Sequence, residues 1–249
     1  MHGAREECRY GTMTERLRCF LGKPIAAGKV SVYSPTVDQI GEIGEPLYNL
    51  YLLLATFDKE EVVRRLFSVD DDDWAQLETE DDFLLLCSIP ALYRSLCDAL
   101  RFFTRSEFVY DEDVQAFVSD GAVIDRQNYR DVVRAVKLVN GIAAAETAPV
   151  RFKNAKAKEL YGKLQHFKAK CARDNDNTLH LKDILSILCH AEGNGIHIFN
   201  VGELTIYQVY EHFERLNVRE RHTRLLKVWA NGYLGRDESL PEWMTRTKL

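Results

Sequence analysis

The sequence predicts a mainly α-helical (α+β) fold with one or two small β-hairpins, placed near the N-terminus and around residues 108–124. Apolar residues recur three and four positions apart over much of the chain, which is typical of buried helix faces. Residues that cap helices precede several of these segments, at Thr36, Asp58, Asp125 and Thr178. Short runs of β-forming residues bounded by glycine and proline mark the two hairpin regions.

The N-terminal part is expected to contain a leader and the first hairpin. Residues 1–13 are polar and are expected to form a flexible leader. Two short extended runs follow, 16–21 and 29–33, and the glycine- and proline-rich connection between them favours a hairpin or a small sheet. Pro35 ends the second strand, because proline cannot donate to a β-ladder.

A helical region is expected from Thr36 to about Phe103. Thr36 and Gln39 match a capping box, and Gly41 and Gly44 interrupt the helix that follows. Further helix starts are expected at Glu45-Pro46, at Asp58 before residues 62–67, at Asp81-Asp82 before residues 83–87, and at Pro90 before residues 92–103.

The second hairpin is expected between Phe108 and Ile124, because short β-forming runs surround the tight-turn pair Asp120-Gly121. Asp125 is expected to cap a helix that ends at Asn140-Gly141. Residues 141–150 have the composition of a linker. The sequence therefore predicts a hairpin-plus-helix domain over 14–145 and a helical region over 151–249.

Two helices are expected in the C-terminal region. Thr178 is expected to cap the first, over 181–191, and glycines at 193 and 195 end it. The second starts near Val201 and runs to about Trp229. Its length makes it the largest single element that the sequence predicts.

The composition is that of a folded protein in a reducing compartment. Apolar residues make up 46% of the chain, charged residues 29%, and the net charge is −5. The six cysteines are scattered with no CxxC pair, which favours free thiols. No apolar run approaches the roughly 20 residues that span a bilayer, and the first residues lack the apolar stretch of a secretory signal. An intracellular protein without a membrane partner is expected.

No sequence motif points to catalysis, a cofactor or a metal. Walker, GxGxxG, GxSxG and HExxH patterns do not occur, so an enzyme is not expected. The histidines and cysteines of the C-terminal third lie at irregular gaps rather than in the close pairs typical of zinc sites. These residues are His166, Cys171, His180, Cys189, His190 and His197.

Two stretches carry strong charge of opposite sign. Residues 58–82 hold eleven acids and three bases, a local charge of −8, but lack the alternation of a calcium loop, so a solvated loop is the favoured interpretation. Residues 151–173 hold eight bases and one acid, a local charge of +7. This stretch could contact phosphates, yet a solvated helix face is favoured because aromatic residues are sparse within it.

The most distinctive segment is 201–216. At about 100° per residue, its apolar residues share one face of a helix, and Tyr207 falls outside that arc. The pattern predicts a packing helix first and a partner-binding helix second. The candidate partner-binding residues are Leu204, Tyr207 and Tyr210, and Tyr207 is expected to project away from the packed face.

Five segments of the chain form a recognisable pattern: Gly22-Lys-Pro-Ile25, residues 29–44, the run 48–54, residues 202–216 and Leu240-Pro-Glu-Trp-Met244. In these segments the chain resembles tail or baseplate assembly proteins, which are chaperone-like, of tailed phages and prophages of Gram-positive bacteria. The segments are patterns of packing residues, and the leader and the basic stretch 151–173 lie outside them.

The resemblance implies a non-catalytic protein of the host cytoplasm that binds a tail component such as a tape-measure or hub-like protein. It transfers no catalytic residue. Retention in the virion tail and self-association stay open. Two other function classes also stay open: a permanent structural subunit of the tail or baseplate, and a nucleic-acid-binding regulator that would use residues 151–173.

Overall fold

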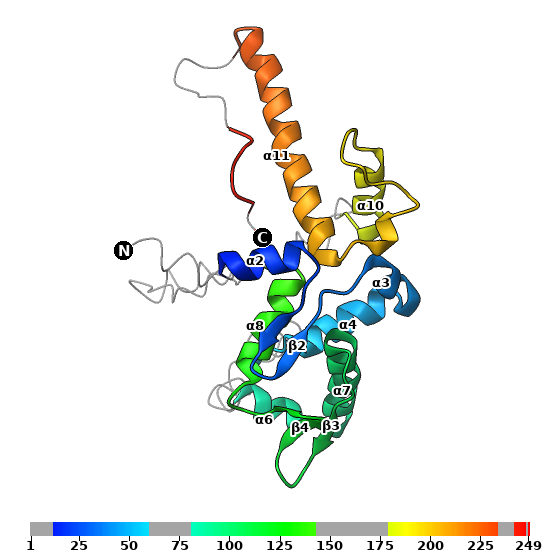
Figure 1. Ribbon diagram of the computed structural model, residues 1–249, viewed down its shortest axis with the longest axis vertical. Helices are drawn as coiled ribbons and strands as arrows, with labels where there is room; N and C mark the ends of the chain where they lie inside the picture. Colours follow the sequence, from blue (N-terminus) through cyan, green and yellow to red (C-terminus); the bar gives the residue numbers. More distant parts are fainter. Residues whose placement is uncertain (1–11, 60–80, 143–178, 234–241, 248) are drawn as a thin grey trace, which may run out of the picture.

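The computed structural model describes residues 12–59, 81–142, 179–233, 242–247 and 249 (Figure 1). Within these ranges the protein is mainly helical and carries two small antiparallel sheets. The predicted α+β class is therefore confirmed. The leader segment 1–11, the acidic segment 60–80 and the basic stretch 151–173 lie outside the described residues, as does Thr178. The division into two regions near residue 150 stays a prediction.

The first described element is a helix where the sequence analysis expected a strand. Residues 16–21 belong to helix α2 (Met13–Phe20), so the prediction of an extended run there is wrong. A capping box starts the helix: Thr12 Oγ1 accepts from the Glu15 amide at 3.2 Å, and the Glu15 carboxylate accepts from the Thr12 amide at 2.7 Å. Met13 is part of this helix and not of the leader.

The first hairpin consists of β1 (Ile25–Ala27) and β2 (Val30–Val32). The turn between them contains Gly28, whose φ of 61° lies in the left-handed region that favours glycine. Alternate residues of both strands point into the core, which the period of two along a strand requires. The hairpin near the N-terminus is confirmed, with its first strand shifted toward the C-terminus of the expected position.

The helices after the hairpin follow the predicted breaks with one exception: Gly41 lies inside α3 (Val37–Ile43), so the prediction that it interrupts this helix is wrong. The Thr36–Gln39 capping box starts α3 (Val37–Ile43), and Gly44, with φ 85°, separates it from α4 (Glu45–Ala55). Asp81 caps α6 (Asp82–Cys87) by accepting from the Phe83 and Leu84 amides. Helix α7 (Pro90–Thr104) carries proline in its first turn, as expected. The helix expected over 62–67 lies outside the described residues.

The second β region has three strands, which match the three short β-forming runs of the expected hairpin region. β3 (Val109–Asp111), β4 (Ala116–Ser119) and β5 (Ala122–Ile124) form an antiparallel meander, and Asp120-Gly121 makes the second turn as predicted. Helix α8 (Tyr129–Val139) follows and ends at Asn140-Gly141. Asp125 lies three residues before the N-cap Asn128, so it orders the preceding turn and does not cap the helix directly.

The C-terminal part contains α10 (Leu181–His190), a short 3-10 turn η2 (Val201–Glu203) and α11 (Ile206–Ala230). Asp183 accepts a hydrogen bond from the His180 amide at the start of α10. The last long helix begins at Ile206, five residues later than expected, because Val201 lies in the 3-10 turn. Its predicted C-terminal end is confirmed within one residue.

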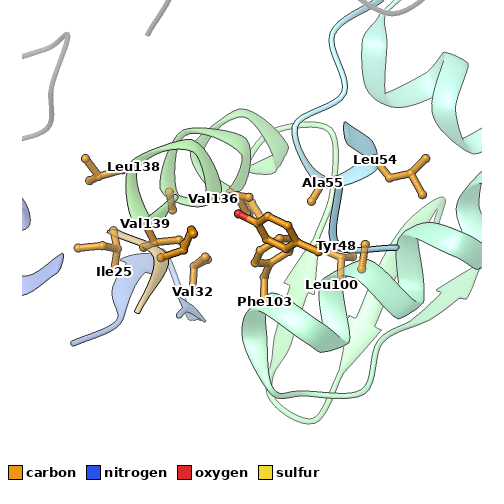
Figure 2. Packing of buried hydrophobic residues seen from close by; sticks show 14 of the residues in the cluster. Ile25, Val32, Tyr48, Leu54, Ala55, Leu100, Phe103, Val136, Leu138 and Val139 are labelled. Atoms are coloured by element: carbon orange, nitrogen blue, oxygen red, sulfur yellow. The ribbon is translucent and has the colours of Figure 1, made fainter. Parts of the chain in front are cut away.

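The core lies between α4, α7, α8 and the first hairpin, where apolar side chains from all of them meet (Figure 2). Tyr48 brings a hydroxyl group into this cluster: it donates to Asn140 Oδ1 at 2.8 Å, and both residues are buried. The same cluster continues into Val201, Ile206 and Val209. One core therefore joins the N-terminal elements to the beginning of α11.

Candidate partner-binding helix

The N-terminal end of α11 is fixed to the body of the protein by backbone hydrogen bonds. The Ile206 amide donates to the Pro35 carbonyl, and the Val37 amide donates to the Leu204 carbonyl, both at 2.9 Å. Thr36 and Thr205 form an isolated antiparallel bridge, and each caps its own helix. The two helix starts, α3 and α11, therefore hold one another in place.

Gly202 permits this close approach. The Asp38 carboxylate of α3 lies against the position that a Cβ at residue 202 would occupy. A larger residue at 202 would require the Asp38 side chain to move. Glycine at this position thus leaves room for the Asp38 carboxylate beside η2.

Tyr207 is buried, which corrects the expectation that it projects away from the packed face. Its side chain is 2% exposed, and burial raises the pKa of its phenol, with the nearby Arg16 opposing that shift. The helical wheel places Tyr207 off the main apolar arc, but α2 covers that second side of α11. A wheel drawn for one helix does not show that two different neighbours pack on it.

The other two candidate residues lie at the same docked end. Leu204 and Tyr210 are half-buried, and both pack against the core cluster. Tyr210 lies beside Gly141, and the side chain of the last residue, Leu249, reaches the same place. The structure therefore brings all three candidates to the junction between α11 and the body, and binding of a partner by Leu204 or Tyr210 stays a prediction.

The described C-terminal residues are tied back to this junction. Thr247 is buried, and its hydroxyl donates to the Glu211 carboxylate at 2.8 Å while accepting from Arg16 at 3.1 Å. The Arg215 guanidinium donates to the Thr245 carbonyl at 2.7 Å. Local sequence patterns carried no signal for these contacts, because Arg16 and Thr247 are 231 positions apart.

The far end of α11 has a different character. Figure 1 shows this end extending away from α2, α3 and α8. We call residues 221–230 the distal segment; at about 1.5 Å per residue it is roughly 15 Å long. It carries Arg221, Arg224 and Lys227 with no acidic residue. Its exposed apolar side chains include Leu226, Val228 and Trp229, the last 57% exposed.

The distal segment has one basic face and one apolar face. Arg221, Arg224 and Lys227 follow one another at intervals of three and share one face, whereas Leu225 and Trp229 lie four apart on another. Exposed tryptophan and arginine are the residues that most often dominate binding energy at protein interfaces. The sequence analysis did not single out residues 221–230, although their basic and apolar pattern is visible in the sequence.

Within the described ranges, no group of three or more histidine, cysteine or acidic side chains could hold a metal ion. Cys19 is buried, and burial raises the pKa of its thiol to about 12. A cavity of about 240 Å³ lies beside Asp82 and Tyr129, where Asp81 and Arg126 form an ion pair at 3.1 Å. Its charges are of both signs, and the sequence offers no nucleophile–base pattern for it.

No helix in the described part of the chain combines the length and apolar character needed to cross a membrane. The distal segment is too short and too basic for that role.

Comparison with known families adds one match. The model of a family described as the YomV second domain matches residues 172–248, which contain α10, α11 and the described C-terminal residues. YomV is a Bacillus prophage gene, so this part of the chain resembles a phage-associated domain. No curated protein and no solved structure shows a significant match.

Proposed function

We propose that the chain is a non-catalytic, chaperone-like assembly protein of a phage tail or baseplate. In this role it binds a tail component, such as a tape-measure or hub-like protein, in the host cytoplasm. The observation that carries the proposal is the division of α11 into a docked half and an exposed distal segment. The phage-associated family match over 172–248 supports the phage context.

The docked half gives the distal segment a fixed direction. A helix of about ten residues is marginal by itself in water, because helix nucleation is unfavourable. Continuation from a capped and buried first half removes that cost. The distal segment can therefore present Leu225, Leu226 and Trp229 to a partner without first having to fold.

The chemistry of the distal segment suits an amphipathic helix with acidic flanks. Apolar residues of such a partner would cover Leu226 and Trp229, and its carboxylates would approach Arg221, Arg224 and Lys227. Long helical proteins that await assembly expose apolar faces of this kind. A protein that covers them would prevent premature association.

Affinity purification from phage-producing cells tests the proposal. The tagged chain should retain a tail protein, identified by mass spectrometry. The variant Leu226→Ala/Trp229→Ala should retain at most about one tenth of that amount. The matched control is Val114→Ala, which removes an exposed apolar side chain from the turn between β3 and β4. Equal capture by the α11 variant, or capture of no tail protein, would contradict the proposal.

Analysis of finished virions distinguishes an assembly chaperone from a permanent subunit of the tail or baseplate. An assembly chaperone should be absent from purified virions even though it binds its partner in the cell. A permanent tail or baseplate subunit would be present in stoichiometric amount, and that result would favour the alternative function.

A further inference from the structure

Helix α2 carries an apolar stripe that nothing in the described chain covers. Met13, Leu17, Phe20 and Leu21 are 60%, 56%, 44% and 54% exposed. Their spacing of four, three and one places them along one side of the helix. We call these four side chains the α2 stripe.

The α2 stripe points outward because the opposite side of the helix is held by specific contacts. Glu15 binds Arg134 of α8 at 2.7 Å, Arg16 binds Thr247, and Cys19 is buried. A surface helix normally turns its apolar side to the core and its charges to water. Here the two are reversed, so the exposed stripe is a fixed feature and not a consequence of loose packing.

The edge of the stripe is positively charged. Glu15 is the only acidic residue of α2, and its carboxylate is already bound by Arg134 and by the Thr12 amide. Arg18 and Lys23 are exposed. The Arg18 guanidinium donates to the Pro24 carbonyl at 2.9 Å, which positions its charge without neutralising it.

A second copy of the chain fits this surface poorly. A symmetric pair would bring Arg18 and Lys23 of one copy near those of the other. Like charges that face one another disfavour association. The like charges therefore argue against self-association through this stripe.

We propose that the α2 stripe is a docking surface for an amphipathic helix with acidic flanks that belongs to a partner protein. The i, i+4, i+7 spacing of Met13, Leu17 and Phe20 is the pattern on which a second helix packs. The stripe also adjoins α11: the Phe20 and His212 rings lie 6.3 Å apart, and Gln208 donates to the Phe20 carbonyl. Only the identity of this partner as a tail component rests on the proposed function.

Two synthetic helical peptides test the docking surface directly. Each is about 21 residues long, with leucine at the a and d positions of three heptads; one carries glutamate at the outer positions and the other lysine. The distal segment would attract the same acidic peptide, so the full chain used in all of these peptide measurements carries Leu226→Ala/Trp229→Ala and the charge reversal Arg221→Glu/Arg224→Glu. In this background, fluorescence anisotropy at low salt should show the acidic peptide binding at least tenfold more tightly than the basic one. Equal binding of the two peptides would overturn the charge argument.

Leu17→Glu should weaken binding of the acidic peptide at least tenfold. Its matched control, Ile198→Glu, introduces the same charge at an exposed apolar residue of the turn before η2, and it should bind the acidic peptide as the chain without this change does. The double charge reversal Arg18→Glu/Lys23→Glu should make the chain prefer the basic peptide. Unchanged binding by Leu17→Glu, or an unchanged preference after the reversal, would overturn the proposal.

Sedimentation of the same proteins decides between the occupants. If the wild-type chain is a dimer and Leu17→Glu is a monomer, a second copy covers the stripe and the proposal is wrong. Peptide binding without capture of any tail protein from phage-producing cells would leave the stripe as a docking surface and reject the tail-assembly role. Tail-protein capture that survives Leu17→Glu but not the loss of Leu226 and Trp229 would support the tail-assembly role and reject the α2 stripe as the docking surface for that tail protein.

Discussion

Replacing Tyr207 by alanine removes one of the largest fully buried side chains of the protein. An aromatic side chain buries about 150–250 Å², and at about 25 cal/mol per Å² its removal from the core costs roughly 4–6 kcal/mol as an upper estimate. Because the surroundings relax in part, the expected loss of unfolding free energy is about 3–5 kcal/mol. For a chain of this size that corresponds to a fall in Tm of roughly 6–20 °C.

Urea denaturation and thermal melting, followed by circular dichroism, measure this loss. Trp229→Ala is the matched control, because it also removes a large aromatic from α11 but from an exposed position, and its Tm should stay within about 2 °C of the wild type. If Tyr207→Ala is as stable as Trp229→Ala, Tyr207 is not packed against α2, and the assignment of the docked half of α11 is wrong.

Two further predictions concern the free energy of unfolding. Tyr48→Phe should lower it by about 1–3 kcal/mol, because the buried Asn140 Oδ1 loses its donor. Tyr129→Phe should leave it unchanged or raise it, since no partner of the Tyr129 hydroxyl is found among the described residues, and urea denaturation of both variants checks the contrast. The Arg134 hydrogen bond holds the pKa of Glu15 below its ordinary 4.5, so the pair stabilises the fold above that pH and the stability is lost as the pH falls through the lowered pKa. Arg134→Met should therefore lose less stability than the wild type between pH 6 and pH 3, by about 0.5 kcal/mol, and an identical pH dependence would contradict this.

Local chemistry predicted most of the helix boundaries. Capping boxes, glycine breaks and first-turn prolines act within a few residues, so Thr36, Gly44, Asp81 and Pro90 could be interpreted from the sequence alone. The same chemistry was present at Thr12 and was overridden by the weak alternation of residues 16–21. That alternation fails as a strand signal because Arg16 and Leu17 sit on different sides of a helix whose apolar side faces water.

The candidate site depended on contacts that no local pattern contains. Tyr207 is buried by α2, and α2 is tied to the C-terminal residues through Arg16 and Thr247. The distal segment is exposed because α11 extends beyond the elements that pack on its first half. A helical wheel does not show where along a helix its neighbours stop. Sequence analysis therefore predicted the long helix, but it could not tell which of its two ends is packed on the body.

Hydrogen–deuterium exchange of the chain alone, and of the chain bound to the tail protein that it captures, is the most direct test of the division of α11. In the free chain, amides of residues 206–216 should exchange slowly and those of the distal segment faster, because only the first group is packed on the body. Binding should slow exchange in the distal segment and leave residues 206–216 unchanged. Unchanged exchange at residues 221–230 in the complex, with protection appearing only elsewhere, would contradict a partner-binding role for the distal segment.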